Sequence, residues 1–257
     1  MITGASAGIG ATFARELASR KYDLILVARR RDRLESLCRE IQDKYDVNCE
    51  ILVADLAKDQ GIEDVVKSIR ETPDLSMLIN NAGFGFRGVF TEADIGKHLD
   101  MIKVHVIATV RLCHAALPAM IANHRGDIIN VSSVSGFMDN PGGSSYNPTK
   151  AYLNSFSKTL RNEVEEYGIR VQALCPGYTR TEFHLANDLT DIVNARVPDN
   201  WWLTSEYVVK KSLKGLEKGQ VICIPHIRYK AIVTLYRNRL IARLMRPIVM
   251  RKSWSKK

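Results

Sequence analysis

Short runs of β-branched and aliphatic residues alternate with longer amphipathic segments along most of the chain. The apolar runs at 23–29, 49–56, 75–83, 127–133, 169–177 and 220–225 are predicted strands, and the predicted helices include 31–45, 62–71, a stretch ending at 124, and 205–217. Strands and helices that alternate at this spacing form βαβ units, with parallel strands and helices on both faces of the sheet. The pattern predicts an α/β fold with a single doubly wound parallel sheet.

The first strand is unusually short. A glycine-rich loop already begins at Gly4, so this strand spans Met1 to Thr3, whereas a strand usually has about 5–6 residues. In a doubly wound sheet the first strand is central, and ligands bind beyond the carboxyl ends of the strands. The loop after it therefore lies where a ligand is expected.

Length and composition narrow the class of protein. A chain of 257 residues can form one sizeable domain with a full core. Its five cysteines are widely spaced without a CxxC pair, which predicts buried, reduced thiols in a cytosolic protein. The six histidines show no HxxxH or HExxH spacing, so no metal site is predicted. No uninterrupted apolar run reaches ~18 residues, and no signal peptide is found, so a membrane span is not expected.

The net charge of +9 is concentrated at the C-terminus. From Lys218 onward there are eleven Lys and Arg and no Asp or Glu, so the preceding residues carry a charge of −2. We therefore predict a main domain at 1–225 and a basic tail at 226–257. Nucleic-acid binding is not expected, because no aromatic stacking platform accompanies the charge.

The segment TGASAGIG at residues 3–10 leads from the first strand into a helical segment. Gly4, Gly8 and Gly10 would allow a tight turn, close approach of a pyrophosphate, and close packing of the helix on the strand. The N-terminus of the helix adds a partial positive charge that favours phosphate. The same loop is also compatible with an ordinary strand-to-helix turn, although its place at the first βα junction favours a dinucleotide.

The end of the second predicted strand indicates which dinucleotide is bound. An NAD site has Asp or Glu roughly 20 residues after the loop, where it binds the ribose hydroxyls. This chain has Ala28 there, followed by Arg29 and Arg30, and guanidinium groups suit a 2′-phosphate. The alternative is a solvated basic helix start, which arginines at a helix N-terminus make unfavourable. We expect NADP as the cofactor.

The segment GGSSYNPTKAYLNSF at 142–156 places a tyrosine four residues before a lysine. On a helix, Tyr146 and Lys150 share one face. A phenol of pKa ~10 beside an ammonium of pKa ~10.4 is a candidate acid, because the cation favours the phenolate and lowers the phenol pKa. Taken alone, such a pair is usually structural, so its chemistry depends on the rest of the chain.

Six motifs in order make the chain resemble the short-chain dehydrogenase/reductase family over about its first 225 residues: TGASAGIG, ADL, NNAG, INVSSVSG, YNPTK and PGYTRT. The resemblance implies a Rossmann-like sheet and assembly as a homodimer or homotetramer. It implies that Asp55 contacts the adenine, and that Thr179 and Thr181 lie near the nicotinamide amide and the diphosphate. The cofactor site implied in this way comprises Gly4, Ser6, Gly8, Ile9, Gly10, Arg29, Arg30, Asp55, Leu56, Asn81, Ala82, Gly83, Tyr146, Lys150, Pro176, Gly177, Thr179 and Thr181.

The resemblance also implies the catalytic residues. Tyr146 would protonate the alkoxide left by hydride transfer, Lys150 would hold the nicotinamide ribose and lower the phenol pKa, and Ser133 would bind the carbonyl oxygen. His105 stands where the family usually has an asparagine that positions a relay water. A neutral imidazole has one donor and one acceptor and could hold that water, with Lys150 keeping it neutral. The alternative is that His105 only fills space.

Two further segments are expected to meet substrate and partners. The stretch 178–205 contains Phe183, Leu185, Trp201 and Trp202, which could form an apolar lid over a bulky hydrophobic carbonyl or anchor the loop to the core. In the tail, Arg239, Arg243 and Arg246 share one helical stripe, which favours peripheral contact with an anionic membrane. The alternative is a helix packed on its own domain or on a sister subunit.

These features together predict a cytoplasmic, NADP-dependent carbonyl reductase, which transfers hydride between NADP(H) and a small-molecule hydrophobic carbonyl or alcohol with Tyr146 as proton donor. One alternative is a reductase of 3-oxoacyl groups on carrier protein or coenzyme A. A second is an NADP-binding sensor or scaffold that turns over little.

Overall fold

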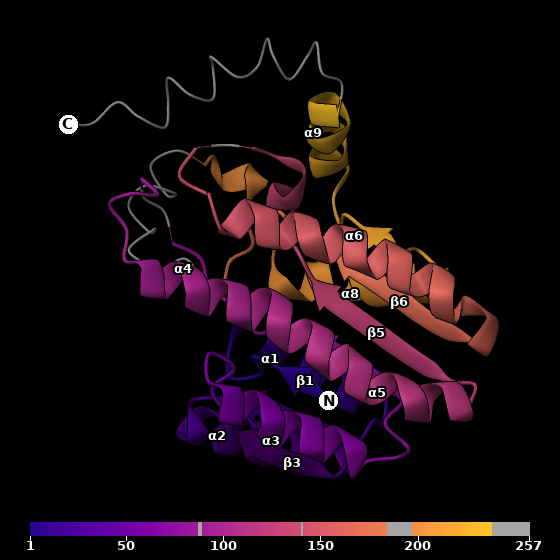
Figure 1. The fold of residues 1–257 in the computed structure, drawn as a ribbon. Coiled ribbons are helices and arrows are strands. Elements are labelled where there is room, and N and C mark those ends of the chain that lie inside the picture. The colour runs from indigo at the N-terminus through magenta and orange to yellow at the C-terminus, as the bar shows by residue number, and fades with distance from the viewer. Residues whose placement is uncertain (87–88, 140, 184–196, 238–257) are drawn as a thin grey trace.

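Seven parallel strands form one sheet in the order β3-β2-β1-β4-β5-β6-β7 (Figure 1). The computed structural model describes residues 1–86, 89–139, 141–183 and 197–237. The strands are β1 (Ile2–Thr3), β2 (Leu24–Ala28), β3 (Cys49–Val53), β4 (Met77–Asn80), β5 (Gly126–Val131), β6 (Ile169–Leu174) and β7 (Ile222–Cys223). Every pairing is parallel. The predicted α/β fold with a doubly wound sheet is confirmed.

Helices cover both faces because successive residues of a strand point to opposite sides of the sheet. Leu26 and Ile79 belong to a core shared with α1 (Gly8–Ser19), α2 (Arg31–Tyr45) and α8 (Ser205–Glu217). Their neighbours Val27 and Leu78 belong to a second core, shared with α3 (Asp59–Arg70), α5 (Thr109–Ala122) and α6 (Tyr146–Val164). Figure 1 shows α5 and α6 crossing in front of β5 and β6.

The short strand β1 is central. Ile2 pairs with Leu26 of β2 on one side and with Ile79 of β4 on the other. The chain proceeds from β1 to β2 and β3 in one direction, and β4 begins the other half of the sheet. Such a reversal of strand order opens a crevice at the carboxyl ends of the two strands. The glycine loop after β1 and the NNAG segment after β4 therefore meet there.

A helix of 28 residues runs from Ile95 to Ala122. It consists of α4 (Ile95–Ile102), a π-helical turn η1 (Lys103–Ala108), and α5. By length and composition alone this helix could cross a membrane, although its sequence contains no uninterrupted apolar run of ~18 residues. Half of its most apolar window is buried inside the protein, and α5 packs against α3 and the sheet. Its apolar character is thus accounted for in part by the core.

Beyond β7 the chain enters α9 (Ile227–Arg237), where Tyr229 and Val233 are buried in the first core. The predicted division at residue 225 stays a prediction, although these contacts tie the start of the tail to the domain. Residues 238–257, which include the predicted stripe of Arg239, Arg243 and Arg246, lie outside the described residues. The described residues also form the short 3₁₀ turns η2 (Val134–Phe137), η3 (Glu165–Tyr167) and η5 (Asp199–Trp201).

Candidate active site

The glycine loop is packed too closely for other residues. A Cβ at Gly10 would lie 2.3 Å from the carbonyl oxygen of Gly4, and Gly4 itself has a φ of +65°. Asn81 holds the loop through its Nδ2 atom, which donates to the carbonyl oxygens of Thr3 and Gly4 at 2.9 and 3.1 Å. The Nδ2 group of Asn81 therefore fixes the shape of the glycine loop.

The N-terminus of α1 is open to an anion. No side chain caps the helix at Ala7, and its first turn contains no acidic residue. The first N–H groups of a helix have no partners within the helix and attract phosphate. The predicted residues Ser6, Gly8 and Ile9 belong to this loop and first turn. A Cβ at Gly8 would lie 3.0 Å from the Cβ of Thr181, so the predicted diphosphate residue Thr181 borders the same turn.

The arginines after β2 reach different partners. Arg30 donates from Nε and Nη2 to the Oγ atom of Ser6, at 3.2 and 3.0 Å, and from Nη1 to Glu182 at 2.9 Å. Arg33, which sequence analysis did not single out, also pairs with Glu182. Arg29 is exposed, and its side chain makes no hydrogen bond or ion pair with any described residue. Ser6, Arg30 and Arg33 thus form the basic end of the groove.

The remaining predicted cofactor residues follow β3, β4 and β6. Asp55 comes after β3, where its carboxylate accepts the N–H of Ala57 at 3.0 Å, and the neighbouring Leu56 is buried. After β6, the carbonyl of Pro176 accepts the N–H of Val134, and Thr179 donates to the carbonyl of Gly177. The segment 176–181 therefore lies between the turn after Ser133 and the glycine loop. Ala82 and Gly83 follow β4, and the N–H of Ala82 donates to Thr3 Oγ1 at 3.1 Å next to the glycine loop.

Ser133, Tyr146 and Lys150 come together at the carboxyl end of β5. Ser133 follows the strand and caps η2, while Tyr146 and Lys150 lie one turn apart at the start of α6. The Nζ atom of Lys150 donates to the carbonyl oxygen of Val131 at 2.9 Å, and Ser132 donates to the carbonyl of Lys150 at 2.8 Å. These two bonds fix the first turns of α6 against the strand end.

Burial controls the protonation of the tyrosine and the lysine. It raises the pKa of Tyr146 to about 12, with the hydrogen bond to Ser133 acting in the opposite direction. It lowers the pKa of Lys150 to about 7. From the sequence we expected Lys150 to lower the phenol pKa. In the protein alone, desolvation instead determines the direction of the shift, because it disfavours the charged form of both groups. Tyr146 therefore keeps its proton at neutral pH.

His105 uses both ring nitrogens within the protein. Its Nε2 atom accepts the N–H of Phe84 at 3.2 Å, so in the neutral ring Nδ1 carries the proton and donates to Thr149 Oγ1 at 2.9 Å. Burial, followed by the charge of Lys150, lowers its pKa well below the usual value. The expectation that His105 holds a relay water is not supported, because neither nitrogen is left over. The ring instead joins the loop after β4 to α6.

His98 is a second buried histidine, which sequence analysis did not identify. Its Nδ1 atom lies 2.6 Å from the Oγ atom of Ser145, the residue before Tyr146. The ring contacts Phe86 and Phe90, with centroid distances of 4.7 and 4.8 Å. No sequence motif marks His98, because its role depends on the meeting of α4 with the start of α6.

The aromatic residues of the predicted lid pack on the protein. Trp201 meets Tyr229 of α9 edge to face at 5.7 Å, and Trp202 lies 5.6 Å from Tyr178. The ring of Phe183 lies 6.1 Å from that of Tyr146. The packing of Trp201 agrees with the anchoring interpretation, whereas Phe183 borders the phenol of Tyr146. Leu185 lies outside the described residues.

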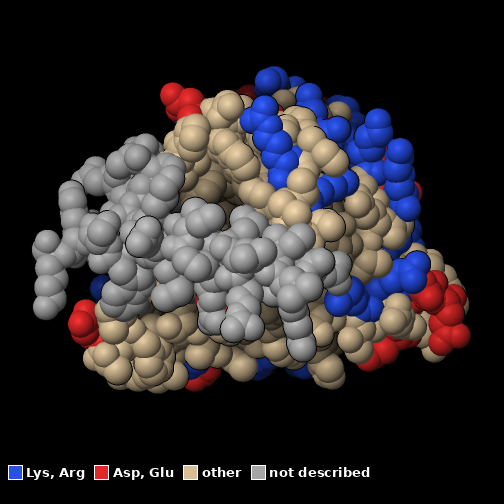
Figure 2. All heavy atoms as spheres, turned by 90° about the horizontal axis from the view of Figure 1, so that it is seen from above, with Lys and Arg blue, Asp and Glu red and all other residues tan. Residues whose placement is uncertain are grey.

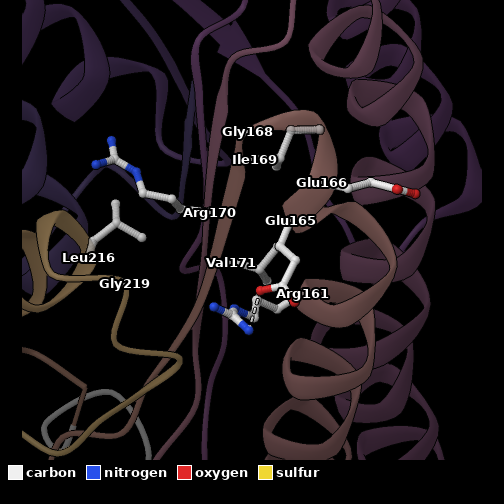
Figure 3. Close-up of a pocket in the computed structure, with 9 residues that line it drawn as sticks. All are labelled: Arg161, Glu165, Glu166, Gly168, Ile169, Arg170, Val171, Leu216 and Gly219. Carbon is white, nitrogen blue, oxygen red and sulfur yellow. Dashed lines mark ion pairs between the residues drawn. The ribbon is translucent and has the colours of Figure 1, made fainter.

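A separate hollow of about 360 Å³ lies at the other end of the sheet (Figure 3). It adjoins the amino end of β6, and an ion pair between Arg161 and Glu165 forms part of its wall. Its position excludes it from the site described above, because Ser133 and Thr179 follow the carboxyl ends of β5 and β6. Its lining consists of Arg161, Glu165, Glu166, Gly168, Ile169, Arg170, Val171, Leu216 and Gly219.

A glycine loop at an uncapped helix and a Ser, Tyr and Lys cluster at the same sheet edge are the features of a dinucleotide-dependent oxidoreductase. Residues 1–190 match the short chain dehydrogenase family, and this chain belongs to that family. A solved short-chain dehydrogenase from Sphingobium yanoikuyae, in complex with NADPH, is 34% identical with a TM-score of 0.82, covering 94% of each chain. Use of a nicotinamide dinucleotide follows from the family and this neighbour.

Relatives differ in their named activities. The human "Inactive hydroxysteroid dehydrogenase-like protein 1" is 34% identical over 183 residues, which are 70% of this chain and 56% of that protein. The NADP-dependent 3-hydroxy acid dehydrogenase of Schizosaccharomyces pombe is 35% identical over 209 residues, 80% of each chain. The very-long-chain 3-oxoacyl-CoA reductase of Anas platyrhynchos is 31% identical over 186 residues, 71% and 60% of the two chains. The chain thus spans little more than half of the human relative.

Proposed function

We propose that this protein is an NADP-dependent reductase of hydrophobic carbonyl compounds. The observation that carries the proposal is the meeting of Ser133, Tyr146 and Lys150 at the same end of the sheet as the glycine loop. Bound NADPH would supply the hydride. Tyr146, which burial keeps protonated, would donate its proton to the carbonyl oxygen, and Ser133 would stabilise the charge that develops there.

NADP rather than NAD is supported by the basic end of the groove. Arg30 already lies against Ser6, and Ala28 stands at the position where an NAD site has Asp or Glu. A 2′-phosphate would gain charge-assisted hydrogen bonds there, each worth on the order of 1.5–3 kcal/mol. Ala28→Asp combined with Arg29→Leu is expected to reverse the preference between NADPH and NADH. Equal affinity of the unaltered protein for both cofactors would contradict the NADP proposal.

A hydrophobic substrate is supported by Phe183, which lies beside Tyr146. The named activity of the Anas platyrhynchos relative favours a 3-oxoacyl thioester as the second candidate, and the name of the human relative supports a sensor or scaffold with little turnover. One experiment separates the three: NADPH oxidation is followed with ketones, 3-oxoacyl-CoA thioesters and no substrate. NADPH oxidation with ketones indicates a carbonyl reductase, and oxidation with 3-oxoacyl-CoA thioesters indicates a 3-oxoacyl reductase. A sensor binds NADPH and oxidises it with neither class.

Assembly and location are also proposals. Apolar side chains are exposed along the helix from α4 to α5, at Ile95, Leu99, Ile102 and Ile107, and they support a homodimer or homotetramer that light scattering can test.

Figure 2 shows Lys and Arg gathered along one side of the upper face. Lys210, Lys211 and Lys214 of α8 are exposed, which supports a cytoplasmic protein in peripheral contact with anionic membranes. If the full chain ignores anionic vesicles at low salt, the membrane proposal is wrong.

A further inference from the structure

Glu182 binds the two arginines at the basic end of the groove. One oxygen of its carboxylate accepts from Nη1 of Arg30 at 2.9 Å, and the other pairs with Nη1 of Arg33. Arg30 lies 24 residues from Ser6 in the chain and Glu182 lies 152 residues from Arg30. Because Nε and Nη2 of Arg30 donate to Ser6 and Nη1 donates to Glu182, one guanidinium joins three segments that are far apart in the chain.

A carboxylate and a phosphate compete for the same donors. Both bind guanidinium groups through charge-assisted hydrogen bonds. The bonds from Arg33 and Arg30 lower the pKa of Glu182, so the carboxylate is ionised at neutral pH. A 2′-phosphate bound to Arg30 would either displace this carboxylate or lie beside a like charge. Both situations oppose the binding of the phosphate.

The position of Glu182 in the chain connects this competition with the catalytic site. It follows Thr181, which borders the glycine loop at Gly8, and precedes Phe183. The ring of Phe183 lies beside Tyr146, and its Cζ atom would be 3.0 Å from a Cβ at Gly85. The ion pairs of Glu182 therefore hold one end of the segment that borders the catalytic phenol.

We propose that Glu182 is a specificity-determining residue for the cofactor, an internal carboxylate that competes with a 2′-phosphate for Arg30 and Arg33. The inference rests on the proposed NADP-dependent function. NADH has a hydroxyl where NADPH has the phosphate, so Glu182 weakens the binding of NADPH and leaves that of NADH unchanged. Removal of the carboxylate charge increases the preference for NADPH.

The expected effect is moderate because the ion pairs are exposed. The side chain of Glu182 is 41% exposed, and those of Arg30 and Arg33 are 43% and 45% exposed. Exposed pairs contribute little each, so Glu182→Gln should lower the Kd for NADPH about three- to ten-fold. The same change is expected for adenosine 2′,5′-bisphosphate, which carries the phosphate without the nicotinamide.

The experiment measures binding by calorimetry with the full chain, using NADPH, NADH and adenosine 2′,5′-bisphosphate. Glu40→Gln is the matched control. Glu40 is 43% exposed and pairs with Arg15 at 2.7 Å, and it lines one hollow together with Ser6 and Arg33. The Glu40→Gln variant removes the same charge nearby without freeing Arg30 or Arg33. Tighter binding of both phosphate-bearing ligands by Glu182→Gln, and not by Glu40→Gln, supports the inference.

Three results would overturn it. Unchanged or weaker binding of NADPH by Glu182→Gln would mean that the carboxylate does not compete or that it positions the arginines for the phosphate. An equal gain from Glu40→Gln would reveal a general effect of charge. An equal increase in the affinity for NADH would show that the effect does not depend on the 2′-phosphate. Failure of the proposed NADP specificity is seen separately, as equal affinity of the unaltered protein for NADPH and NADH.

Discussion

The Nζ atom of Lys150 lies 5.7 Å from the centre of the Tyr146 ring. The two groups share one face of α6, and burial disfavours the charged form of both. The arrangement keeps the phenol protonated, as a proton donor requires, while it places an amine in an unfavourable environment. Active sites often retain such locally unfavourable groups at a cost in stability.

Lys150→Met should make the cofactor-free protein more stable and abolish turnover. Burial lowers the lysine pKa to about 7, while the unfolded chain has a pKa of ~10.4. Between these values the unfolded state binds more protons, so stability rises with pH. The destabilisation caused by burying the Lys150 ammonium is greatest below about pH 7 and disappears near pH 10. Lys150→Met should therefore raise the free energy of unfolding by about 2 kcal/mol at pH 7, a net value that includes the loss of the hydrogen bond to Val131.

Denaturant unfolding between pH 7 and pH 10 measures this gain. Lys158→Met on the same helix is the control, because Lys158 is exposed and its replacement should change little at any pH. A methionine variant that is less stable than the unaltered protein at pH 7 would show that the bond to Val131 outweighs the desolvation of the amine.

Tyr146→Phe should retain NADPH binding and lose turnover by roughly 10²–10⁴-fold, the usual contribution of general acid catalysis. The ring and its packing against Phe183 remain, while the proton donor is removed. Tyr152→Phe is the control, since Tyr152 lies on α6 with 43% of its surface exposed. Steady-state NADPH oxidation and equilibrium binding give both quantities. Near-normal reduction by the phenylalanine variant would assign the proton to another group.

His105→Leu should slow reduction, because Phe84 and Thr149 each lose a hydrogen-bond partner and Thr149 in turn contacts the carbonyl of Tyr146. His105→Asn should recover part of the rate. The pKa of His105 is lowered well below its usual value, so the ring stays neutral around pH 7. The pH–rate profiles of the asparagine variant and the unaltered protein should therefore coincide between about pH 6 and 8. If the acid limb of the pH–rate profile of His105→Asn shifts in that window, His105 takes part in the proton transfer.

Gly177→Ala should destabilise the protein by about 1–3 kcal/mol through overpacking. A Cβ at Gly177 would lie 2.1 Å from the ring of Tyr229, whose hydroxyl accepts the N–H of Tyr178 and donates to the carbonyl of Trp201. Tyr229→Ala should also destabilise, while the added cost of alanine at 177 should fall in the double variant. Additive effects in this double-mutant cycle would show that the two residues do not interact.

The sequence by itself determined the features that depend on local periodicity. Apolar runs predicted the strands, and α2 and α8 have the predicted bounds, because helical and strand periods are properties of short segments. The glycine spacing predicted the loop, and the separation of four residues placed Tyr146 and Lys150 on one helix face. The position of Ser133 beside them followed from the family resemblance rather than from any local rule.

Tertiary structure decided the features that depend on burial and on residues far apart in the chain. The pKa of Tyr146 is raised because desolvation outweighs the hydrogen bond to Ser133, and no sequence pattern reports that balance. His105 is engaged on both nitrogens only because α6 and the loop after β4 meet at its ring. Glu182 reaches Arg30 across 152 residues. Such contacts arise when the strands align their carboxyl ends, which local sequence does not encode.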